Sequence, residues 1–114
     1  MLKLVSAKDP RLFRIPPEHR PAVERAIESL ASIFGREPDP SDDGFVGYVE
    51  RGDTRETVRR ETGRNLSNLE GVFRDGPCLV GVLLWGNAGA GVTLVCPDED
   101  GYAPEVISTL RENL

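Results

Sequence analysis

Apolar residues are concentrated between positions 69 and 97, and their pattern predicts three consecutive β-strands. Two turn signals divide this stretch: Asp-Gly within 74–76, which favours a tight hairpin, and the glycine-rich segment 86–91. The middle strand, 78–85, is apolar at both odd and even positions, whereas a strand with one exposed face would alternate apolar and polar residues. We therefore predict a central strand covered on both faces, either by helices of the same chain or by a second copy.

The second turn also sets an expected strand register, which bears on the two cysteines. If Gly86 faces Gly91, three cross-strand pairs follow: Trp85–Val92, Leu83–Leu94 and Gly81–Cys96. Cys78 then lies on the opposite face of the sheet from Cys96, and on the order of 10 Å further along the strands. A disulfide requires Cα atoms within about 7 Å of each other. We therefore predict two free, buried thiols.

Two segments carry apolar residues at helical spacing. The first stripe consists of Val23, Ala26, Ile27, Leu30 and Phe34, and the second of Val106, Ile107, Leu110 and Leu114. Proline is tolerated only in the first turn of a helix, so Pro21 and Pro104 place the helix starts close to positions 20 and 104. Gly35 suits the left-handed position that ends a helix. We predict helices over 20–34 and 104–113.

Three smaller elements complete the predicted secondary structure. The segments 2–6 and 45–50 are expected to be strands. The segment 54–62 predicts a short polar helix, with Asp53 as its N-cap and Glu56 completing a capping box. A polar helix of this length is marginally stable alone, so we expect it to lie on the surface.

These elements predict an α+β fold of one domain over residues 1–114. We expect a two-layer sandwich with a mainly antiparallel sheet of four or five strands, which ends in the three-strand meander. The helices 20–34 and 104–113 are expected to pack on one face of that sheet, in addition to the short polar helix at the surface.

Composition and charge argue against nucleic-acid-binding, membrane-spanning and secreted proteins. The net charge is −5, which argues against direct binding to nucleic acid because such proteins present a basic face to the phosphates. No apolar run reaches the ~18 residues of a membrane span, and the first residues lack a secretory apolar core. With two free thiols expected, we predict a cytoplasmic protein that does not bind membranes.

The charged residues are unevenly distributed and suggest a candidate interaction surface. Negative charge gathers at Asp98, Glu99 and Asp100, and positive charge on the short polar helix at Arg55, Arg59 and Arg60. Asn87 is added because it lies in the glycine-rich turn, where a partner's backbone can approach closely. The alternative for each group is an ordinary solvated surface. The acidic segment 36–44 offers carboxylates to a cation but does not match a calcium-loop spacing. The acidic run 98–100 could also hold a metal, but solvation and the dipole of the following helix explain its charge first.

The sequence contains no recognisable catalytic arrangement. His19, the single histidine, has no serine or cysteine at motif spacing, and both cysteines fall in predicted strands, where burial makes a thiol inert. A strand follows the glycines of 86–91, so they do not form a phosphate-binding loop, which requires a helix there. We therefore expect no catalytic residue, no cofactor and no metal.

Together these observations favour a small protein-binding or regulatory module, of the inhibitor or immunity kind, that recognises a basic partner protein through its acidic patches. Two alternatives stay open. One is a homo-oligomer, such as a homodimer, that covers the second apolar face and binds a small ligand at the interface. The other is a metal-assisted hydrolase that uses carboxylates on loops.

Overall fold

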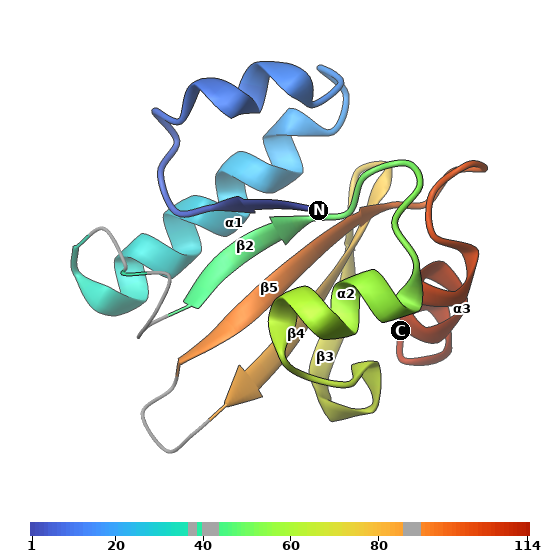
Figure 1. The fold of residues 1–114 in the computed structure, drawn as a ribbon. Helices are drawn as coiled ribbons and strands as arrows, with labels where there is room; N and C mark the ends of the chain where they lie inside the picture. The colour runs from blue at the N-terminus through green and yellow to red at the C-terminus, as the bar shows by residue number, and fades with distance from the viewer. Residues whose placement is uncertain (37–38, 40–43, 86–89) are drawn as a thin grey trace.

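The computed structural model describes residues 1–36, 39, 44–85 and 90–114 (Figure 1). Within these ranges the helices are α1 (Arg20–Phe34), α2 (Arg55–Thr62) and α3 (Pro104–Glu112), with short 3-10 turns at Pro10–Arg14 and Leu66–Asn68. The strands are β1 (Leu2–Leu4), β2 (Gly44–Tyr48), β3 (Leu69–Asp75), β4 (Cys78–Trp85) and β5 (Ala90–Pro97).

The five strands form one mixed sheet in the order β1-β2-β5-β4-β3. β3, β4 and β5 form the predicted antiparallel meander, and β1 pairs antiparallel with β2. β2 runs parallel to β5, so the N-terminal half of the chain joins the meander through a parallel pair. The predicted α+β class, the mainly antiparallel sheet of four or five strands and the meander are confirmed; the sheet has five strands.

The two main helices lie on opposite faces of this sheet, so the predicted placement of both on one face was wrong. Successive residues of a strand point to opposite faces. Val80 and Val82 of β4 line a groove with α1, whereas a Cβ added to Gly81 would lie 2.8 Å from Leu110 of α3. Each side of the sheet therefore carries at least one of the chain's own helices, and we call the two sides the α1 face and the α3 face.

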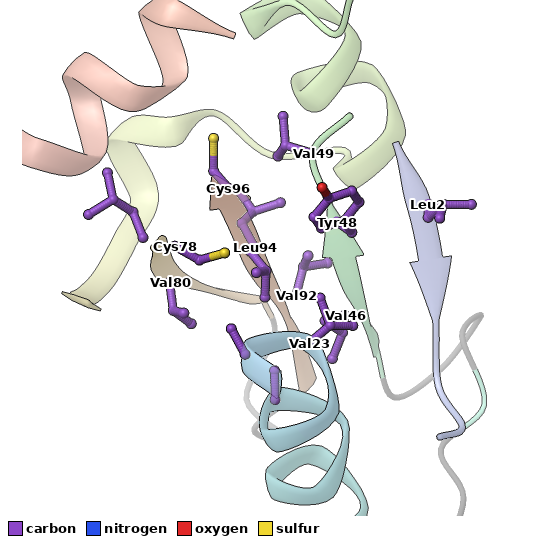
Figure 2. Packing of buried hydrophobic residues seen from close by; sticks show 14 of the residues in the cluster. Leu2, Val23, Val46, Tyr48, Val49, Cys78, Val80, Val92, Leu94 and Cys96 are labelled. Atoms are coloured by element: carbon purple, nitrogen blue, oxygen red, sulfur yellow. The ribbon is translucent and has the colours of Figure 1, made fainter. Parts of the chain in front are cut away.

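Helix α2 shares the α3 face. Arg55 of α2 and Glu105 of α3 line a common hollow, and Figure 1 shows α2 in front of the sheet with α1 behind it. Val58 is the single apolar residue of α2 and is fully buried, which anchors an otherwise polar helix. Figure 2 shows the core between these layers, where side chains of β2, β4 and β5 gather.

The register of β4 against β5 differs by two residues from the predicted one. Leu83 pairs with Val92 and Leu79 pairs with Cys96, because Trp85 pairs with Ala90 rather than with Val92. A shift of two residues keeps every side chain on its predicted face, since strand side chains alternate with a period of two. Cys78 and Cys96 therefore still lie on opposite faces.

The ends of the helices follow local capping chemistry. α1 spans Arg20–Phe34 and is capped by Gly35, which adopts a left-handed conformation with φ of 65°, as predicted. The cap of α2 differs from the prediction: Thr54 and Thr57 form the capping box, each hydroxyl accepting the other's backbone N–H. Asp53 instead accepts the backbone N–H of Glu50 at 2.8 Å.

Both thiols are free and buried, which confirms the prediction. Burial raises the pKa of Cys78 and of Cys96 to about 12. We expect neither thiol to react with a disulfide reagent at about pH 8 in the native protein, because the thiolate is the reactive form. Both should react once the protein is unfolded in denaturant. Fast reaction of either thiol in the native protein would contradict its burial.

Candidate functional site

The chain's single histidine and both its tyrosines meet at one point of the structure. The His19 side chain is only 1% exposed. Its Nδ1 lies 2.9 Å from the Tyr48 hydroxyl and its Nε2 lies 2.8 Å from Oε1 of Glu99. The Tyr48 hydroxyl in turn donates to the Tyr102 hydroxyl at 3.4 Å, and the Tyr102 ring stands edge-on to the imidazole. We call these four residues the His19 cluster.

The cluster joins three segments that are distant in sequence. His19 precedes α1, Tyr48 ends β2, and Glu99 and Tyr102 belong to the segment between β5 and α3. The guanidinium of Arg51 stacks over the Tyr102 ring at 4.4 Å and also donates to the carbonyl of Asp100 at 3.1 Å. The His19 cluster therefore fixes the acidic segment 98–102 against the end of the sheet.

The chemistry available to the cluster follows from its burial. Desolvation raises the pKa of Tyr48 above its usual range, so its hydroxyl stays protonated at neutral pH and acts in hydrogen bonds rather than as a nucleophile. Both ring nitrogens of His19 already have partners. The cluster is thus a satisfied polar network, of the kind that specifies one arrangement of its surroundings.

One group of side chains in the described part of the chain has the composition of a metal site. Ligand-type atoms of Glu18, His19 and Glu99 lie within 4.8 Å of one another. An imidazole and two carboxylates suit a divalent transition metal. In this structure, however, the Nε2 of His19 is already hydrogen-bonded to Glu99, so a metal would have to replace that contact.

The predicted acidic patch is largely neutralised by partners within the chain. Asp98 accepts hydrogen bonds from Arg74, at 2.6 Å, and from Arg111, and its side chain is 8% exposed. Glu99 is held by His19, whereas Asp100 is exposed. These three residues line a cleft of about 880 Å³ along α3. The structure thus brings the three acidic residues together, and of the three only Asp100 is an exposed residue.

The predicted basic group lies beside α3 as well. Arg59 is paired with Glu56 at 2.6 Å. Arg55 lines a hollow together with Glu105 of α3, and Arg60 is exposed. Asn87, the remaining member of the predicted surface, lies outside the described residues, as do parts of the acidic segment 36–44 and of the glycine-rich turn.

Acid sensitivity should follow from Asp98. The hydrogen bond from Arg74 lowers the pKa of this carboxyl, so its contribution to stability is present above about pH 4 and is lost as the pH falls through the lowered value. We expect Asp98→Asn to reduce the free energy of unfolding by about 1–2 kcal/mol at neutral pH.

The same substitution should flatten the loss of stability below about pH 4, since the titrating carboxyl is gone. Urea unfolding followed by circular dichroism at neutral and acidic pH measures both effects. The matched control is Asp100→Asn, whose side chain is exposed and should change stability by less than about 0.5 kcal/mol. Equal effects of the two substitutions would contradict the pairing of Asp98.

A second candidate site, which the sequence analysis missed, is an apolar groove on the α1 face. It has a volume of about 350 Å³. Its lining includes Ala26, Leu30 and Ile33 of α1, Phe73 of β3, and Val80 and Val82 of β4. We call it the α1–β3 groove. α1 packs mainly on β2 and β5 and reaches β3 through the hydrogen bond from Arg25 to Asp75, at 2.8 Å, so the groove lies between α1 and the edge strand β3.

Two large apolar side chains are exposed at this groove. Ile33 is 72% exposed and Phe73 is 53% exposed. Both line the groove, from α1 and from the edge strand β3. In the sequence, only the apolar residues on both faces of β4 indicated such a groove. This pattern does not show which face of the sheet stays partly uncovered.

Comparison with models of known protein families, with curated proteins and with solved structures found no match for this chain. Among the helices of the described ranges, none is long and apolar enough to cross a membrane.

Proposed function

We propose that this protein is a small protein-binding module whose partner docks in the α1–β3 groove. The observation that carries the proposal is the exposure of Ile33 and Phe73 on the two sides of one apolar groove. Contiguous exposed apolar surface is typical of interaction sites, and aromatic residues are frequent anchors in them. A module of this kind acts by occupying a surface of its partner, as inhibitors and immunity proteins do.

The energetics favour docking at the groove over docking at the acidic segment. Covering the exposed part of Ile33 and of Phe73 contributes on the order of 1 kcal/mol for each side chain. Asp98 and Glu99 already have partners within the chain, so a basic partner would gain little from them. A hydrolase built on these carboxylates has the same difficulty, because both are engaged.

Site-specific photocross-linking tests the proposal. A benzophenone amino acid replaces Ile33 in one variant and Phe13 in another. Phe13 is the matched control, since it is 80% exposed but lies away from the groove and is stacked under Arg20. Irradiation in the native host, followed by mass spectrometry, identifies any chain that lies against either position.

We expect the variant at position 33 to capture one discrete polypeptide and the variant at position 13 to capture none. Adding Phe73→Ser to the first variant should reduce the captured product about tenfold or more, because an aromatic anchor is lost. Adding Phe13→Ser should leave the product unchanged. Absence of a specific product at position 33, or a product that persists with Phe73→Ser, would overturn the proposal.

A further inference from the structure

Strand β3 is an open edge of the sheet, and its unpaired backbone groups can be identified. The N–H of Asp98 donates to the carbonyl of Pro77, just before β4, at 2.9 Å. Because the backbone groups of successive residues point to opposite neighbours, the odd-numbered residues of β4 form backbone hydrogen bonds with β5 and the even-numbered ones with β3. Their partners on β3 are the odd-numbered residues, since Phe73 pairs with Val80. The backbone N–H and C=O groups of Val72 and Arg74 therefore point away from the sheet.

We propose that β3 pairs antiparallel with β3 of a second copy, about a two-fold axis that passes through Val72. This inference rests on the proposed function, since it names the occupant of the α1–β3 groove. Under this symmetry Glu70 lies opposite Arg74 of the second copy, and Gly71 lies opposite Phe73. In this register each even-numbered residue of β3 lies opposite an even-numbered residue of the second copy. The outward backbone groups belong to even-numbered residues, so they can form hydrogen bonds between the two copies.

The apolar part of the edge is self-complementary in this register. A Cβ added to Gly71 would meet nothing within 4 Å, so the space above this glycine is open. Gly71 pairs with Val82, which lines the α1–β3 groove. The ring of Phe73 from the second copy would lie over Gly71 at the end of that groove. An aromatic residue opposite a strand glycine is a favourable cross-strand pair.

The charged residues of β3 favour a two-fold axis at Val72 over an axis at an adjacent residue. Glu70 opposite Arg74 occurs twice by symmetry, and opposite charges on facing strands attract. Arg74 also binds Asp98, but a guanidinium has five N–H donors and can serve both carboxylates. Shifting the axis to Phe73 would place Arg74 opposite Val72 and lose both ion pairs. The register of β3 against β4 shifts between Leu69 and Gly71, so the regular edge extends no further toward the N-terminus than Glu70.

Sedimentation equilibrium with a charge-swap series tests the two-fold pairing. We expect a dimer for the wild-type chain at about 100 µM, where a complex with a micromolar Kd is nearly complete. Arg74→Glu and Glu70→Arg should each weaken the dimer about tenfold or more, because like charges then face each other. The double variant Glu70→Arg/Arg74→Glu should restore it. Arg55→Glu, on α2 rather than on β3, is the control and should not change the dimer.

An engineered disulfide tests the register directly. On the axis, the two copies of residue 72 lie opposite each other with Cα atoms about 5.5 Å apart, within disulfide range. We expect Val72→Cys to form a covalent dimer under mild oxidation, whereas Arg55→Cys should not. The native cysteines are buried and do not compete. Thermal unfolding of every variant verifies that it is folded.

The outcomes separate this inference from the proposed function. A wild-type chain that is monomeric at this concentration, or a folded double variant that fails to recover the dimer, would overturn the second copy as occupant. If photocross-linking at position 33 then captures a different protein in a Phe73-dependent manner, the groove is a binding site for another partner. Capture of the protein's own chain together with charge-swap recovery supports both proposals.

Discussion

Gly44→Ala is expected to be the most damaging single substitution in the described part of the chain. Gly44 has a φ of +126°, a conformation that residues with a side chain rarely adopt. An added Cβ would lie 1.9 Å from the carbonyl oxygen of Gly91 on the parallel partner strand. That oxygen belongs to the backbone, so it cannot move aside without separating β2 from β5. We expect a loss of roughly 3–5 kcal/mol in the free energy of unfolding, or failure to fold.

Gly35→Ala is the matched control for this substitution. Gly35 also has a positive φ, of 65°, but a Cβ there would meet nothing within 4 Å. It should lose only about 1 kcal/mol, which isolates the backbone strain from the steric clash. Urea unfolding monitored by far-ultraviolet circular dichroism measures both variants. A Gly44→Ala protein as stable as Gly35→Ala would mean that β2 and β5 do not approach each other as closely as described.

His19→Ala is expected to have the second largest effect. The substitution empties a fully buried site and removes the partner of both the Tyr48 hydroxyl and the Glu99 carboxylate. We expect a loss of about 2–4 kcal/mol in the free energy of unfolding, from the cavity and the lost hydrogen bonds together. The segment 98–102 should also open more often, because one of its attachments is gone.

Two measurements check this expectation. Amide hydrogen exchange should become faster for Glu99 and Tyr102 in the His19→Ala protein, while α2 should keep its protection apart from the general loss of stability. Tyr48→Phe is the matched comparison, since it removes one hydroxyl and keeps the ring; we expect it to cost about 1 kcal/mol. A His19→Ala protein with wild-type stability and unchanged exchange at Glu99 would show that the cluster does not hold this segment.

The elements that could be predicted from the sequence are those whose signal is local. α1 carries its apolar stripe, its first-turn proline and its terminal glycine within one short stretch, and it forms as predicted. The hairpin of β3 and β4 likewise follows from the turn at Gly76, whose φ is 58°. By contrast, the predicted register of β4 against β5 rested on an assumed pairing of Gly86 with Gly91, and the apolar residues of the two strands fit several registers equally well.

The arrangement of layers and the candidate sites depend on distant residues. β4 is apolar on both faces, so its pattern cannot assign α1 to one face and α3 to the other. The His19 cluster draws its members from positions 19, 48, 99 and 102, which nothing in the sequence connects. The pairing of Asp98 with Arg74 and Arg111 also depends on tertiary structure, and it turns a run that looks like an exposed acidic patch into a largely neutralised one.

The parallel pair of β2 and β5 has a consequence for the order of folding. The strands of the meander are neighbours in the sequence, whereas the parallel pair joins Gly44 to Gly91 across the segment that contains α2, β3 and β4. Closing a long chain segment costs more entropy before contacts compensate for it. We therefore expect β3, β4 and β5 to be structured in the folding transition state and β1 and β2 to dock afterwards. Substitutions in the meander should then slow folding, and those in the N-terminal strands should mainly speed unfolding.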